Sequence, residues 1–200
     1  MLEEVKDYIT AKLKKQIPSH IFLDRMRVGD EEFRQSFIYN NPNYIPFYYW
    51  LGTILKPKTL IEIGFGLGFM SGNFLKSCKT VNYFLAIQEK KSGEYYSSRL
   101  GKSNVLDNYK GDFYIHTGDI TDDVLKSHEF DLALISEQTT YDKYRLYFDF
   151  LQMSKEGIMV VEHLNKSKSC STAFKDFCRS INREPVYINT AYGIGVVNGF

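Results

Sequence analysis

Two short segments of the sequence carry residue types that could do chemistry. Three glycines at alternate positions, Gly64, Gly66 and Gly68, follow the apolar run 59–63 and precede a helical stretch. Glycine has no Cβ and adopts φ values that other residues avoid, so such a turn lets an adenosine-type cofactor touch bare main chain. Much later, the run 157–163 ends in Glu162 and His163, an acid and an imidazole suited to removing a proton from a substrate.

The glycine spacing distinguishes between cofactors. A dinucleotide-binding turn has the pattern GxGxxG, whereas here Gly68 is followed by Phe69 and Met70, which gives GxGxG after the acidic strand residue Glu62. This spacing disfavours a nicotinamide-dependent oxidoreductase.

The elements around these segments predict an α/β fold. From Lys58 onward, strands alternate with helical stretches, as in βαβ units of a mostly parallel sheet. The predicted strands are 59–63, 81–87, 113–117, 130–135, 157–162, 185–190 and 194–197. The predicted helical stretches between them are 67–78, 92–100, 121–126, 141–153 and 171–182. Upstream, apolar spacing predicts a helix over 2–17, a short one after Asp30 carrying Phe33 and Phe37, and a third from Pro46.

The segment 60–68 reads hydrophobic-Glu-hydrophobic-Gly-x-Gly-x-Gly and resembles the first motif of class I S-adenosylmethionine-dependent methyltransferases. The resemblance extends over about Lys58 to Val197. It implies a Rossmann-like, seven-stranded, mostly parallel sheet in the order 3-2-1-4-5-7-6, with the last strand antiparallel and helices on both faces. It also implies that Glu62 orients the turn or reaches the cofactor's amino group, and that the three glycines pass under its methionine and ribose portions.

Two later positions extend the resemblance less closely. In this family an acid at the end of the second strand binds the ribose hydroxyls, but here Gln88 stands at that place, with Glu89 one residue later. Either Glu89 serves, or Gln88 accepts with its single carbonyl oxygen. After the third strand, Gly118-Asp119 resembles the position whose carboxylate meets the adenine, although Asp119 would also suit a helix cap.

The loop after the fourth strand resembles a branch of the family that includes the catechol-type O-methyltransferases. Where metal-dependent members carry an aspartate ligand, this sequence has Ser136, which we assign to the cofactor side, and Thr139 replaces a histidine. Because hard divalent ions need several carboxylate or carbonyl oxygens, we predict no metal.

The resemblance places Glu162 and His163 at the same sheet edge as the glycines. Methyl transfer is an in-line displacement, so the enzyme aligns the acceptor and, for a hydroxyl, helps remove its proton. His163 is the candidate base, with Glu162 orienting it or serving instead. A strand-end histidine also fits a plain hydrogen-bonded loop residue. The aromatic run from Tyr44 to Trp50 fits either a roof over the acceptor or core packing.

The length and charge of the chain limit the kinds of partner that it could bind. The 200 residues fit one domain, which we divide into an N-terminal helical cap (1–55) and a cofactor-binding core (58–200). With 25 basic and 24 acidic residues, there is no strong charge for holding a nucleic acid, so a small-molecule acceptor is expected. No run is long and apolar enough for a membrane span or signal peptide, so we expect a soluble, cytoplasmic protein. Homo-oligomer formation stays open.

Two features of the sequence fit other functions. The segment 41–44 is an imperfect copy of the Asn-Pro-Pro-Tyr motif of DNA amino-methyltransferases, but its third residue is Asn43 rather than proline. A non-catalytic binding or scaffold protein with the methyltransferase fold would explain Gln88 and the missing metal ligands together. The prediction is an S-adenosylmethionine-dependent, metal-independent methyltransferase for a small-molecule acceptor.

Overall fold

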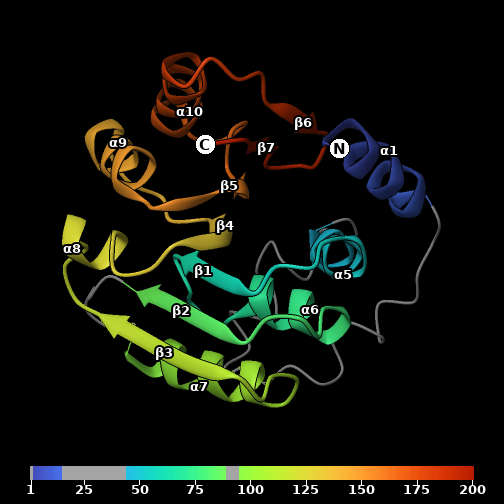
Figure 1. The fold of residues 1–200 in the computed structure, drawn as a ribbon, viewed down its shortest axis with the longest axis vertical. Coiled ribbons are helices and arrows are strands. Elements are labelled where there is room, and N and C mark those ends of the chain that lie inside the picture. The colour runs from blue at the N-terminus through green and yellow to red at the C-terminus, as the bar shows by residue number, and fades with distance from the viewer. Residues whose placement is uncertain (1, 15–43, 89–94) are drawn as a thin grey trace.

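The computed structural model describes residues 2–14, 44–88 and 95–200, and it shows a twisted seven-stranded sheet between two layers of helices (Figure 1). The strand order is β3-β2-β1-β4-β5-β7-β6, and β7 runs antiparallel to both of its neighbours. This order, including the antiparallel last strand, confirms the predicted fold class.

The strands and helices follow one another along the chain in the predicted order. The strands are β1 (Thr59–Ile63), β2 (Tyr83–Gln88), β3 (Asp112–Thr117), β4 (Phe130–Ile135), β5 (Met153–Val161), β6 (Val186–Ile188) and β7 (Ile194–Asn198). The described helices are α1 (Leu2–Leu13), α5 (Tyr44–Ile54), α6 (Phe69–Ser77), α7 (Tyr95–Leu106), α8 (Asp122–Leu125), α9 (Tyr141–Phe150) and α10 (Lys168–Ser180). None of these described helices is long and apolar enough to cross a membrane.

The central strands are mostly apolar, because helices cover both of their faces. In β1, Leu60 packs in the core formed with α1, α5, α6 and α7, whereas Ile61 and Ile63 pack in the core formed with α8, α9 and α10. Glu62 is on the same face as Leu60, since side chains alternate along a strand. The acidic residue of the glycine motif therefore points toward the layer that contains α5.

Several element boundaries differ from the prediction. Helix α9 ends at Phe150 rather than at Met153, because β5 already begins at Met153. Helix α1 ends at Leu13 rather than near Ile17, and the stretch from 15 to 43, including the helix predicted after Asp30, lies outside the described residues. Helix α7 continues past Gly101 to Leu106. A Cβ on Gly101 would lie 2.7 Å from the carbonyl oxygen of Gly66. The glycine thus lets the helix approach the glycine turn instead of ending it.

Helix α5 packs against α6 at another close approach. A Cβ on Gly52 would lie 2.3 Å from Ser77 Oγ and 2.4 Å from the Phe74 carbonyl oxygen, well inside contact distance. The absence of a side chain at Gly52 therefore sets how near α5 comes to the sheet edge.

We expect Gly52→Ala to destabilise the protein by about 1–3 kcal/mol through overpacking, even though alanine favours helices. Urea unfolding monitored by circular dichroism measures this free energy. Thr10→Ala, on the exposed side of α1, is the control and should change stability little. A Gly52→Ala protein as stable as the control would show that α5 can move away at no cost.

Candidate functional site

The glycine turn connects β1 to α6 in a left-handed backbone conformation. The φ angles of Gly64, Gly66 and Gly68 are 88°, 49° and 65°. A Cβ on Gly64 would lie 2.6 Å from the backbone nitrogen of Glu137, and one on Gly68 would lie 3.0 Å from the Gly101 oxygen. Gly66 differs, because among the described residues the nearest atom to its added Cβ is 4.0 Å away. The outer two glycines are needed for packing, whereas the Cβ position of Gly66 is open among the described residues.

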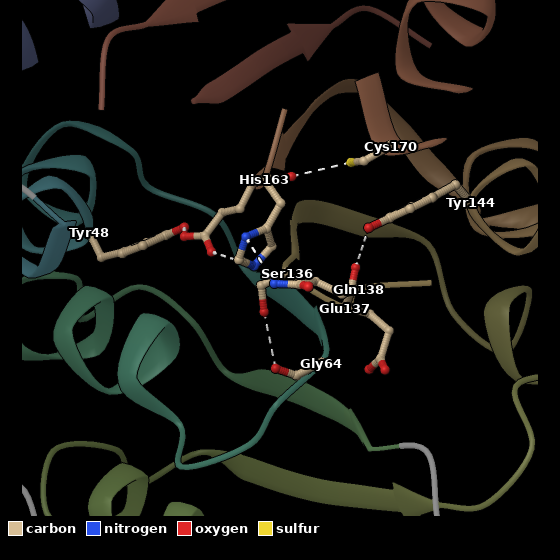
Figure 2. Close-up of polar contacts among 9 residues, drawn as sticks. Tyr48, Gly64, Ser136, Glu137, Gln138, Tyr144, His163 and Cys170 are labelled. Carbon is tan, nitrogen blue, oxygen red and sulfur yellow. Dashed lines mark hydrogen bonds and ion pairs between the residues drawn. The ribbon is translucent and has the colours of Figure 1, made fainter. Parts of the chain in front are cut away.

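Three side chains from different elements hold this turn. Gln88 Oε1 accepts a hydrogen bond from the Gly66 backbone nitrogen at 2.6 Å. Asn104 Nδ2 donates to the Leu67 carbonyl at 3.0 Å, and Ser136 Oγ donates to the Gly64 carbonyl at 3.1 Å (Figure 2). The turn is therefore preorganised by β2, α7 and the end of β4.

These contacts give roles that the sequence did not indicate. Gln88 and Ser136 were expected to bind cofactor, and both contact the turn itself. Their contacts to a cofactor stay predictions, as does that of Glu89, which lies outside the described residues. Asn104 lies inside α7 with no motif around it, so nothing in the sequence marked it.

Glu62 is a buried carboxyl below the turn, 1% exposed. Burial raises the pKa of Glu62 from 4.5 to about 8, the hydroxyl and backbone of Ser71 lower it in part, and the nearby Glu162 raises it again. Among residues 2–14, 44–88 and 95–200, its Oε2 atom finds no hydrogen-bond partner. Near neutral pH Glu62 holds its proton, and it presents one unoccupied oxygen to any cationic ligand.

Glu162 and His163 follow the end of β5, as predicted, and both are buried. Tyr48 of α5 donates its hydroxyl hydrogen to Glu162 Oε1 (Figure 2). Glu162 Oε2 lies 3.8 Å from His163 Nε2. The structure thus brings a tyrosine, a carboxyl and an imidazole into one row at the carboxyl edge of the sheet.

His163 has a strained backbone and a partly shielded ring. Its φ of 65° is left-handed, which costs a non-glycine residue about 1–2 kcal/mol. Its carbonyl accepts hydrogen bonds from the backbone nitrogens of Lys166 and Ser167 at 3.0 and 2.8 Å, so the turn into α10 fixes this conformation. Burial lowers the pKa of His163, and the backbone of Ser136 offsets part of this shift. At neutral pH the imidazole is therefore uncharged and able to accept a proton.

Two more acids follow strand ends at this edge of the sheet: Glu137, which was not among the predicted site residues, and Asp119, which was. Glu137 is buried, and its carbonyl accepts a hydrogen bond from the Tyr144 hydroxyl at 2.5 Å. Asp119 is exposed, and its backbone oxygen lies 3.0 Å from His116 Nε2. The described residues contain no group of three or more His, Cys, Asp or Glu side chains arranged to hold a metal ion. The carboxylate of Asp119 stays a candidate for the adenine position.

Comparisons with known proteins agree on the fold. The sequence matches no protein-family model and no curated protein. Among solved structures, the chain is similar to a methyltransferase of Podospora anserina bound to S-adenosylhomocysteine, with a TM-score of 0.65, 14% identity, and coverage of 100% of this chain and 97% of the other. The chain is also similar to an O-methyltransferase of Bacillus cereus in complex with S-adenosylhomocysteine, with a TM-score of 0.62, 14% identity, and coverage of 99% of this chain and 100% of the other.

A third structure is the O-methyltransferase TomG of Streptomyces achromogenes in complex with S-adenosylmethionine, with a TM-score of 0.53, 14% identity, and coverage of 98% and 96%. The chain therefore has the Rossmann-like fold of class I S-adenosylmethionine-dependent methyltransferases, as its glycine motif predicted. At this level of identity the likeness shows the fold, and the site must be argued from its own residues.

The buried carboxyl gives a prediction about stability and pH. In the unfolded chain Glu62 ionises near 4.5, whereas the folded protein keeps the proton up to about 8. The folded state therefore binds more protons between these values, and its stability falls as the pH rises through that window. We expect Glu62→Gln to raise the free energy of unfolding by about 3 kcal/mol near pH 8 and by much less near pH 5.

Urea unfolding of both proteins at the two pH values measures this difference. Glu129→Gln, at an exposed carboxyl, is the matched control and should show no such pH dependence. A stability gain of equal size at both pH values would contradict the raised pKa and would point to packing instead.

Proposed function

We propose that this protein transfers a methyl group from S-adenosylmethionine to a small-molecule acceptor without a metal ion. The observation that carries the proposal is the open space at the Cβ position of Gly66 among the described residues, in a turn that Gln88 and Asn104 hold in place. A preorganised turn of this kind gives an adenosyl cofactor a floor at the carboxyl edge of the sheet. The similar structures that contain this cofactor or its product support the same assignment.

The residues present fit the cofactor chemically. Its amino acid portion carries an ammonium group, and the unpartnered Oε2 of Glu62 is a suitable acceptor in a buried place. The cofactor, when bound, supplies an electrophilic methyl group on a positively charged sulfur. The chain's part is to hold this group and the acceptor in line, since displacement at carbon needs alignment above all.

His163 is the candidate base for a hydroxyl acceptor. It is neutral at pH 7 because burial lowers its pKa, so one ring nitrogen is available to take the acceptor's proton. Absence of a metal is proposed from the chemistry of the loop after β4, where Ser136 stands in place of an aspartate and uses its hydroxyl to hold Gly64.

A second candidate function has one specific observation in its favour. Gln88, which stands where the resemblance implies a ribose-binding acid, accepts a hydrogen bond from the Gly66 nitrogen on its Oε1 atom. A protein that kept the fold without turnover, as a binding or scaffold subunit, would tolerate this change. Tight binding of S-adenosylmethionine with no methyl transfer to any acceptor would favour this alternative.

Cofactor binding is the first prediction of the proposal. S-adenosylmethionine at a hundred times its dissociation constant should stabilise the protein by about 2.7 kcal/mol, which a thermal-shift assay detects. Gly66→Leu should abolish the shift because its side chain enters the space above the turn. Gly199→Leu is the control, since Gly199 also has a left-handed φ of 79° but its added Cβ would meet the side chain of Arg183 rather than the glycine turn. A full shift in Gly66→Leu would remove the turn as the cofactor site.

Proton removal is the second prediction. With a panel of hydroxyl- and amine-bearing acceptors, formation of S-adenosylhomocysteine measures turnover. For a hydroxyl acceptor, His163→Asn should lower kcat by roughly 10²–10⁴-fold while cofactor binding persists, since asparagine tolerates a left-handed backbone. Because the pKa of His163 is lowered, activity should persist below the ordinary histidine value of 6.5 and fall only at more acidic pH.

His128→Asn, at an exposed histidine, is the matched control and should leave kcat unchanged. Equal turnover by His163→Asn and the control would show that the acceptor loses its proton without this imidazole.

A further inference from the structure

The hydroxyl of Tyr48 connects an N-terminal helix to the candidate base. We propose that Tyr48 is a positioning residue that acts through Glu162 to fix the ring orientation and the tautomer of His163. The inference rests on the proposed function, in which His163 takes the acceptor's proton, and it assigns part of the site to α5.

The position of the Tyr48 hydroxyl is fixed by packing. Tyr48 is 1% exposed, and its ring meets that of Phe47 edge to face, with centroids 4.9 Å apart. The helix that carries it is held against α6 at Gly52, where no side chain fits. Since the helix and the ring are both confined, the hydroxyl has little freedom to leave Glu162.

Glu162 links the Tyr48 hydroxyl to the His163 ring. Its backbone is pinned on both sides, because its nitrogen donates to the Ile135 carbonyl at 2.9 Å and its carbonyl accepts from Cys170 Sγ at 3.2 Å. Its side chain takes the Tyr48 hydrogen on Oε1 and faces His163 Nε2 with Oε2, at 3.8 Å. With one oxygen held by Tyr48, the other is directed at the imidazole.

The Oε2 atom of Glu162 influences which ring nitrogen of His163 carries the proton. An acceptor beside Nε2 favours a proton on that nitrogen and leaves the lone pair on Nδ1. Gln138, in the loop after β4, has its Nε2 atom 3.5 Å from His163 Nδ1 (Figure 2). The ring also lies beside Tyr192, with centroids 5.0 Å apart. Nδ1 is therefore the nitrogen that keeps the lone pair, and it faces the side chain of Gln138.

A plain packing role for Tyr48 would predict something different. Phenylalanine would fill the same space in α5 and keep the aromatic contact with Phe47, so the fold and the cofactor turn would be unaffected. Only a role through Glu162 makes the state of the His163 ring depend on one hydroxyl group. The test must therefore measure the tautomer of the His163 imidazole directly.

The test compares wild type and Tyr48→Phe by ¹⁵N NMR of the histidine side chains, with His163→Asn used to assign the signals. In the wild-type protein, with or without S-adenosylhomocysteine, we expect His163 to carry its proton on Nε2. In Tyr48→Phe we expect the ¹⁵N shifts of both ring nitrogens to move toward a mixture of tautomers. Tyr8→Phe is the matched control, since it removes a hydroxyl that bonds Thr53 Oγ1 at 3.0 Å elsewhere in the helical layer.

For an acceptor that is turned over, Tyr48→Phe should lower kcat roughly tenfold or more and leave KM and the cofactor-induced thermal shift nearly unchanged. Glu162→Gln provides a second variant if Tyr48→Phe does not fold, and it should disturb the same ring signals. Identical His163 signals in wild type and variant, or a wild-type proton on Nδ1, would overturn the inference. The NMR result does not depend on cofactor binding, so failure of the proposed function would be recognised separately by the absent thermal shift.

Discussion

The close approach of the β1 end to the β4 end is the constraint on which the site depends. Main chain of Gly64 lies against main chain of Glu137, where a single Cβ would come within 2.6 Å of a nitrogen. Parallel pairing of Ile63 with Ile135 sets this approach, and pairing of Ile135 with Val161 brings the end of β5 to the same edge. Because parallel strands end together, residues 64, 136 and 162 gather without any long loop having to carry them there.

Buried acids give this edge its electrostatic character. Glu62, Glu137 and Glu162 are each buried, and none of the described lysines or arginines is. Burial disfavours the charged form of Glu62, and repulsion from Glu162 adds to this effect. The ligand-free protein lowers this cost by keeping a proton on Glu62. A ligand with a positive charge would replace the proton, so the same burial that makes the carboxyl destabilising would also favour the binding of a cation.

The sequence predicts the scaffold better than the site. Strand alternation predicted the mostly parallel sheet, and the family resemblance carried by the glycine motif implied its strand order; both rest on local patterns read within a few residues. Helix α7 was expected to end before Gly101, since the use of that glycine is decided by the Gly66 carbonyl of a distant turn. Asn104 and the role of Gln88 were missed for the same reason. Tyr48 stood in an aromatic run that fitted core packing equally well, and only the fold puts Glu162 beside its hydroxyl.

The contact between Tyr48 and Glu162 also bears on how the N-terminal helices relate to the α/β core. A buried carboxylate without partners costs several kcal/mol, and the tyrosine that bonds this one comes from α5, 114 residues earlier in the chain. Helix α1 in turn packs on α5 and on the β6–β7 edge of the sheet. A helical layer that only roofed the site could be exchanged without changing the chemistry below it. Because α5 supplies a hydrogen bond to the buried acid, a division at residues 55–58 would separate two side chains that are in direct contact.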